Sequence, residues 1–172
     1  LKEIVIPDTT VKLGDSAFYG CTSLTELTIP ASVVEIGANL LEESVNITSL
    51  SIPFLGADAD TADTLGYLFN DNVPRKLETV AVTNAKSLAD DCFSDCGYIK
   101  SITINNGIAE IGEKAFKECY SLEAILIPNS VEVIGTEAFL NCQSMESISI
   151  PSSVTSIEEN ALKGCIALKS IT

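Results

Sequence analysis

The sequence predicts an α/β repeat fold, a solenoid in which one short unit is stacked along the whole chain. Four cysteines, Cys96, Cys119, Cys142 and Cys165, recur every 23 residues. The surrounding residues recur with them, since residues 119–141 read CYSLEAILIPNSVEVIGTEAFLN and residues 142–164 read CQSMESISIPSSVTSIEENALKG. Repetition at a period of about 20–50 residues is typical of solenoids, which offer an extended surface instead of a single pocket. Binding is therefore the first function to consider.

The first element of each unit is a short β-strand. Residues 27–29, Leu-Thr-Ile, alternate apolar and polar side chains, which is the pattern of a strand with one buried face. Pro30 ends the strand because it has no N–H to donate. Strands of successive units should align as one parallel sheet along one face of the solenoid. Their inward side chains should form a row that contains Leu27, Ile104, Ile127 and Ile150.

Two shorter elements complete the unit. Residues 33–37 predict a second short strand that ends at a turn glycine. The segments Asp15–Phe18 and Thr136–Phe139 each predict one helical turn, because a polar capping residue precedes an Ala-Phe pair. Glu158 takes the place of the glycine found at positions 14, 37, 112 and 135, so its turn must avoid positive φ or tolerate strain.

The repeats indicate a single domain over residues 1–172, with about seven to eight units. Residues 54–73, FLGADADTADTLGYLFNDNV, interrupt the period and are interpreted as an insertion. The chain begins and ends within a unit, so we expect a longer protein truncated at both ends, because natural solenoids end in capping units. We expect a monomer, although truncated ends would expose apolar core and favour end-to-end association.

Composition and charge exclude several classes of partner. The chain carries 24 acidic and 10 basic residues, which gives a net charge of −14 and a pI near 4.2. Such a surface repels phosphate backbones, so nucleic-acid binding is not expected, and anionic membranes are disfavoured for the same reason. No apolar run approaches the ~20 residues that span a bilayer, so membrane insertion is not expected either.

The sequence offers no catalytic constellation. It contains no histidine, so Ser-His and Cys-His pairs are impossible. The cysteine spacing lacks a C-x-x-C pair, does not fit a zinc site and predicts buried reduced thiols. Asp58, Asp60, Asp63 and Asp71 crowd the insertion, but an EF-hand loop from Asp58 would place Asp63 at its glycine and Phe69 at its glutamate. A looser calcium site is the alternative; we expect no enzyme activity, metal or cofactor.

The unit L-x-x-I-x-I-P…V-x-x-I-G…A-F-x-x-C resembles the BspA-type leucine-rich repeat of bacterial surface proteins. The resemblance covers nearly the whole chain, because the Pro, Gly, Ala-Phe and Cys columns recur together. It implies a right-handed, gently curved leucine-rich-repeat solenoid, extracellular or at the cell surface, that binds a host or microbial protein or glycan without catalysis. Two other roles stay open: a structural spacer in a surface protein, and a substrate-binding appendage of a larger secreted enzyme.

The candidate binding surface is the outward face of the predicted sheet, which is rich in small hydroxyl side chains. The residues predicted to contact a partner there are Glu26, Ser49, Thr79, Ser101, Thr103, Leu126 and Ser149. Leu126 is an exposed apolar side chain flanked by hydroxyls. A neighbouring column predicts cross-strand pairs of Lys100 with Glu123 and of Lys169 with Glu146.

The insertion supplies a second candidate surface with two alternative interpretations. Phe54, Tyr67 and Phe69 belong to its apolar set. They either fold back and bury against the flank of the solenoid, or stay partly exposed and anchor a partner. In the second case all three are predicted contact residues.

Overall fold

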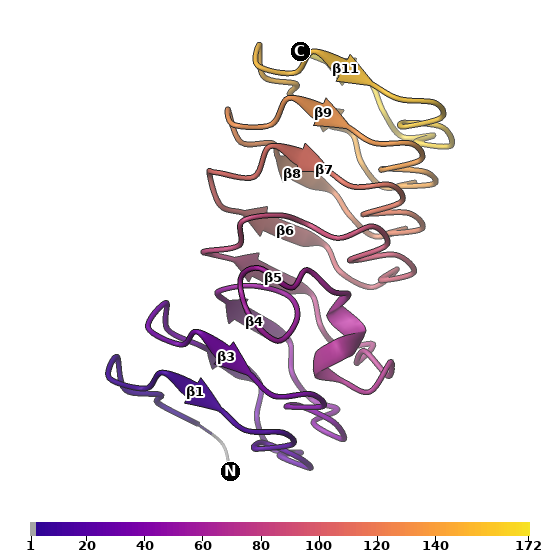
Figure 1. Cartoon of the computed structure of the whole chain (residues 1–172). Coiled ribbons are helices and arrows are strands. Elements are labelled where there is room, and N and C mark those ends of the chain that lie inside the picture. The colour runs from indigo at the N-terminus through magenta and orange to yellow at the C-terminus, as the bar shows by residue number, and fades with distance from the viewer. Residues whose placement is uncertain (1–2) are drawn as a thin grey trace.

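The alternating segments form parallel strands that stack into one row along the molecule, which the computed structural model describes over residues 3–172 (Figure 1). Five strands are hydrogen-bonded in the order β2 (Glu26–Thr28), β4 (Ser49–Ile52), β5 (Thr79–Val82), β6 (Ser101–Ile104) and β8 (Ala124–Leu126). A bridge between Leu126 and Ser149 continues the row to β10 (Ser147–Ile148), which pairs with β12 (Ser170–Ile171). The predicted parallel sheet is confirmed.

Equivalent residues of successive units lie opposite one another in this row. The column that begins with Leu27 runs through Leu50, Val80, Ile102 and Ile125, and all five side chains are buried. The expected row of Leu27 with Ile104, Ile127 and Ile150 is therefore wrong at Leu27. Ile104 pairs with Val82 and belongs to the neighbouring inward column, two residues further along each strand.

The second extended stretch of the unit forms two separate small sheets. In the first, β1 (Lys12–Leu13) pairs with β3 (Glu35–Ile36). In the second, β9 (Val133–Ile134) lies between β7 (Glu110–Ile111) and β11 (Ser156–Ile157). The short second strands are thus present as predicted, but the third and fourth units have none.

The third side of each coil consists of tight turns, so the prediction of helical turns is wrong. Among residues 3–172 the only helix is the 3-10 helix η1 (Leu65–Leu68). In the segments expected to be helical, Ser16 and Glu137 have φ values of 52° and 56°, which are left-handed and incompatible with an α-helix. The same position is left-handed in other units, at Asn39, Asp91, Lys114 and Asn160.

These left-handed turns let neighbouring coils bond to each other through the backbone. The N–H of Lys114 donates to the carbonyl oxygen of Thr136 at 2.9 Å, and the N–H of Phe116 donates to that of Ala138 at 2.8 Å. An α-helix would direct these N–H groups to carbonyls four residues earlier in the same coil. The Ala-Phe pattern therefore reflects burial of two side chains in the core, not helix formation.

The interior is mainly aliphatic, with one aromatic stack and one column of thiols. Phe93, Phe116 and Phe139 stack with ring centroids 5.5 and 5.1 Å apart. The Cys119 thiol donates to the carbonyl oxygen of Phe93 at 3.1 Å, and the Cys142 thiol makes the same contact with Phe116 at 3.2 Å. All six cysteines are free; four are buried, as predicted, whereas Cys21 and Cys165 are only half-buried.

Close approach of neighbouring coils explains the glycine column. A β-carbon on Gly37 would lie 2.2 Å from the backbone nitrogen of Asp15, and one on Gly135 would lie 2.8 Å from the carbonyl oxygen of Ile111. Neither glycine has a positive φ, and Glu158, the exception in this column, also avoids it. Gly37 and Gly135 are therefore required because a neighbouring coil leaves no space for a side chain, and not because of an unusual backbone conformation.

The expected insertion is an enlarged second half of the third unit. Residues 54–73 span 20 positions where the second unit has 13, at 31–43. The N–H of Leu41 donates to the carbonyl oxygen of Leu68 at 2.8 Å, and the N–H of Leu65 donates to that of Cys92 at 2.8 Å. The backbone ladder thus continues through η1, which lies on the flank of the stack and is drawn in magenta in Figure 1.

Candidate interaction surface

The outward side chains of the strand row form a surface that we call the sheet face. It comprises the predicted contact residues Glu26, Ser49, Thr79, Ser101, Thr103, Leu126 and Ser149, which the parallel register brings into two adjacent columns. Leu126 is 71% exposed, and its neighbours in register are Thr103 and Ser149, both exposed. The side chains expected to line the face therefore do so, and Leu126 is available for direct contact with a partner.

Two ion pairs flank this face. Lys169 pairs with Glu146 at 3.0 Å, as predicted. Lys100 pairs with Glu78 at 3.0 Å, on the opposite side from the predicted partner Glu123. These four side chains are all about half exposed or more, so the pairs contribute little to stability.

The aromatic side chains of the enlarged unit do not form an exposed anchor patch. Phe54 and Phe69 are 2% and 1% exposed and belong to the hydrophobic core. Tyr67 is half-buried and packs against the same core. Of the two interpretations of this segment, the structure matches the one in which it folds back, so Phe54 and Phe69 cannot contact a partner directly.

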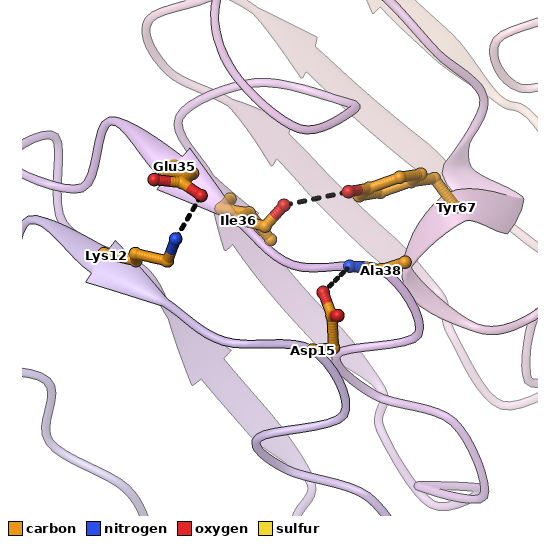
Figure 2. A network of polar contacts seen from close by, with 6 residues as sticks. All are labelled: Lys12, Asp15, Glu35, Ile36, Ala38 and Tyr67. Atoms are coloured by element: carbon orange, nitrogen blue, oxygen red, sulfur yellow. Dashed lines mark hydrogen bonds and ion pairs between the residues drawn. The ribbon is translucent and has the colours of Figure 1, made fainter.

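Tyr67 ties the enlarged unit to the second unit. Its hydroxyl donates to the carbonyl oxygen of Ile36 at 3.0 Å, and Figure 2 shows the ring reaching from η1 to β3. In the same network Asp15 accepts the N–H of Ala38 at 3.0 Å, and Lys12 pairs with Glu35. Three successive coils are therefore linked by side chains on this flank, and Tyr67 has a structural role.

In the acidic loop of the enlarged unit, Asp58 and Asp60 contact different partners. Asp58 accepts the N–H groups of Asp60 and Thr61 at 2.9 and 2.7 Å, and hydrogen bonds to Thr61 and Asp60 hold the pKa of Asp58 below its ordinary value. Asp60 pairs with Lys86 at 2.6 Å. Within residues 3–172 no group of three or more His, Cys, Asp or Glu side chains is placed to hold a metal ion.

Sequence reasoning missed a cluster at the edge where the chain enters β6 and β8. We call it the tyrosine edge and define it by Arg75, Asp95, Tyr98, Glu118 and Tyr120. Tyr98 and Tyr120 are 47% and 41% exposed, and the Arg75 guanidinium lies 5.3 Å from the centroid of the Tyr98 ring. Tyr98 lies one column away from Arg75 and Tyr120, which occupy equivalent positions two coils apart, so only the juxtaposition in space reveals the cluster.

The buried thiols are unsuited to chemistry. Burial raises the pKa of Cys96 to about 12 and also raises the pKa values of Cys92 and Cys119. A thiol with a raised pKa stays protonated at neutral pH and is a poor nucleophile.

In the part of the chain that the structure describes, no helix has the length and apolar character to cross a membrane.

Stacked coils, a parallel strand row and an interior of repeated aliphatic columns define a leucine-rich-repeat solenoid, a class of typically non-catalytic domains that mediate protein binding. Residues 1–58 and 67–172 match the family described as BspA type leucine rich repeat region, in six copies. The chain belongs to this family. The unmatched residues 59–66 lie in the enlarged unit, where the period is broken.

Solved structures of bacterial leucine-rich-repeat proteins share the fold. A Bacteroides ovatus protein is 26% identical with a TM-score of 0.67, over 97% of this chain and 41% of its own. A Eubacterium ventriosum protein is 31% identical with a TM-score of 0.61, over 81% of this chain and 36% of its own. The pneumococcal vaccine antigen PcpA, 23% identical, aligns over 94% of this chain and 42% of its own with a TM-score of 0.56, a likeness of fold.

The chain therefore spans less than half the length of these solved relatives. None of the curated proteins matches it.

Proposed function

We propose that the chain is an extracellular or cell-surface interaction module that binds a host or microbial protein or glycan through its sheet face. The observation that carries this proposal is the open strand row, in which Leu126 is 71% exposed among hydroxyl side chains. Small side chains on both sides of Leu126 allow a partner to approach the backbone closely, and the exposed leucine offers apolar area whose burial by a partner is favourable.

The extracellular location is supported by membership of the BspA-type family, whose repeat is that of bacterial surface proteins. The experiment is to label intact cells that express the natural protein with an antibody to this region and to digest their surface with protease. Signal on intact cells that protease removes is the expected result. Signal only after lysis would contradict the proposed location.

The binding role is tested with purified protein on immobilised extracellular-matrix proteins and glycans. Replacing an anchor residue by aspartate should weaken binding by about tenfold or more, because it removes apolar contact and buries a charge. The change is Leu126→Asp, and the matched control is Val34→Asp, which alters an apolar side chain that is 63% exposed outside the sheet face. Equal effects of both substitutions, or no binding above background, would contradict the proposal.

A second candidate function is that of a structural spacer. The observation that favours it is the backbone ladder, which joins the coils on the strand row and on the turn side and continues through the enlarged unit. A spacer would bind nothing in the screen, and Leu126→Asp would leave every property of the full-length surface protein unchanged. The same experiment therefore separates the two functions.

A further inference from the structure

The tyrosine edge differs from the rest of the surface because it combines exposed aromatic rings with charges of both signs. Tyr98 precedes β6 and Tyr120 precedes β8, so the two rings lie on successive coils. The ring of Tyr120 leans over Gly97, where an added β-carbon would lie 3.0 Å from its Cδ2 atom. The glycine lets the Tyr120 ring lie close to the backbone, and both tyrosine side chains remain partly exposed.

One of these rings already holds a cation. The guanidinium of Arg75 lies 5.3 Å from the centroid of Tyr98, which is within the range of a cation–π interaction. Beside it lies a small cavity of about 110 Å³, lined by the apolar side chains of Val73, Pro74 and Ile99 and also by the charged Arg75 and Asp95. The edge thus holds one guanidinium against a tyrosine ring. The adjacent recess has the apolar surface to receive the aliphatic part of a second long basic side chain.

The adjacent carboxylates lack such a partner. Asp95 and Glu118 lie on successive coils, and Glu118 accepts a hydrogen bond from the Tyr120 hydroxyl at 2.5 Å. Within residues 3–172 neither carboxylate forms an ion pair with a lysine or arginine. Burial, and after it the charge of Glu118, raises the pKa of Asp95, as expected for two carboxylates that repel each other. An incoming cation would relieve that repulsion.

We propose that the tyrosine edge is a docking site for a segment of a partner protein that carries arginine or lysine side chains. Charge complementarity argues for this occupant. The chain has a net charge of −14, and among the described residues Asp95 and Glu118 form no ion pair, although the charge of Lys117 acts weakly on Asp95. A basic side chain placed over Tyr120 and against Glu118 would repeat the arrangement of Arg75 over Tyr98. A neutral glycan would leave the repulsion between Asp95 and Glu118 in place.

This inference deepens the proposed interaction function and rests on it, but it concerns a different surface from the sheet face. The test measures fluorescence anisotropy of a labelled Gly-Arg repeat peptide with purified protein at about 150 mM salt, where weak surface attraction is screened. A Gly-Glu repeat peptide serves as the negative probe. Circular dichroism confirms that each variant is folded before its binding is measured.

Two double variants remove the two kinds of contact. Tyr98→Leu with Tyr120→Leu removes the rings, and Asp95→Asn with Glu118→Gln removes the charges. The charge-matched control is Glu110→Gln with Glu132→Gln, two exposed carboxylates at β7 and next to β9, outside both the sheet face and the tyrosine edge. The aromatic control is Tyr19→Leu. The Tyr19 side chain is 58% exposed and lies near the first coil, away from the tyrosine edge. Both edge variants should bind the Gly-Arg peptide about tenfold more weakly, and the controls should change binding by less than about threefold.

Three outcomes would overturn the proposal. Equal weakening by the charge-matched control would show that the peptide senses net charge alone. If the Gly-Arg peptide does not bind, the tyrosine edge is not a docking site for basic segments. The binding role of the sheet face would still be tested separately by Leu126→Asp. Binding of a neutral oligosaccharide that depends on Tyr98 and Tyr120, in place of the peptide, would identify the edge as a glycan site.

Discussion

The hydroxyl of Ser44 donates a hydrogen bond of 2.8 Å to the carbonyl oxygen of Phe18, in the column where other units place a cysteine thiol. The same oxygen atom of Ser44 accepts the N–H of Cys21 at 3.1 Å. Serine and cysteine are thus equivalent at this position because each offers a small side chain with one hydrogen to donate to the preceding coil.

That equivalence predicts the effect of changing Ser44. Ser44→Ala removes both side-chain hydrogen bonds and leaves only the 3.4 Å bond from the Cys21 N–H to the Phe18 carbonyl oxygen, so it should lower the free energy of unfolding by about 1–3 kcal/mol. Ser44→Cys keeps a donor and should cost less than half as much. Chemical denaturation midpoints measure both. A Ser44→Ala protein as stable as the natural one would show that the column needs only small size.

Gly37 and Gly14 occupy the same column but differ in their surroundings. A β-carbon at Gly37 would collide with the backbone of the preceding coil, whereas one at Gly14 would meet nothing within 4 Å. Gly37→Ala should therefore destabilise the chain by about 2 kcal/mol or more, and Gly14→Ala should be neutral or stabilising by up to about 1 kcal/mol. Thermal denaturation of both variants checks the difference, and equal effects would contradict the close-approach explanation.

Because the backbone at Glu137 is left-handed, glycine should be tolerated there better than a β-branched residue. A β-branched residue is strained at a φ of 56°, so Glu137→Val should cost about 1–2 kcal/mol. Glu137→Gly relieves the strain and should be neutral or stabilising, although glycine would destabilise a true helical turn. Urea denaturation of the two variants decides between a left-handed and a helical turn.

Cysteine reactivity should divide the thiols by burial. Iodoacetamide at about pH 8 should alkylate the half-buried Cys21 and Cys165 of the folded protein before the others. Cys92, Cys96, Cys119 and Cys142 should react only after unfolding, since burial keeps Cys92, Cys96 and Cys119 protonated and blocks access to all four. Mass spectrometry of peptides without prior reduction reads out each site. Paired cysteines in that experiment would contradict the thiol column.

Asp95 predicts a pH dependence of stability. Its raised pKa means that the folded chain holds the proton more tightly than the unfolded chain, so this contribution is fully present below about pH 4 and is lost as pH rises through the raised pKa. Asp95→Asn should therefore raise Tm at pH 7 by about 1–3 °C and leave it nearly unchanged at about pH 3. Glu26→Gln is the control, and a gain that is the same at both pH values would contradict the assignment.

The strand row could be predicted from the sequence because each strand carries its own signal. Leu27 and Ile29 alternate with exposed residues, and Pro30 follows them, so neither register nor partner is needed to recognise the element. The exposed position of Leu126 follows from the same alternation. The sheet face was accessible to sequence reasoning for this reason, although which columns align needed the actual pairing.

The turns and the tyrosine edge could not be predicted in this way. Ala138 and Phe139 both point into the core, as they would in one turn of helix, and only the bond from the Phe139 N–H to the Ala161 carbonyl oxygen distinguishes a ladder between coils. Arg75 and Tyr98 occupy different columns of the repeat, so their contact has no periodic signature. The enlarged unit breaks the 23-residue period, and its packing depends on contacts with the coils on either side of it.

The first and last described coils lie at opposite ends of the stack (Figure 1), so a pull on the two ends acts along the axis of the molecule. The bonds between coils then break one coil at a time, beginning at an end. Each regular coil that detaches releases 23 residues, or roughly 80 Å of chain, so the protein would lengthen stepwise under tension. A stack built in this way absorbs force gradually while its remaining coils stay folded.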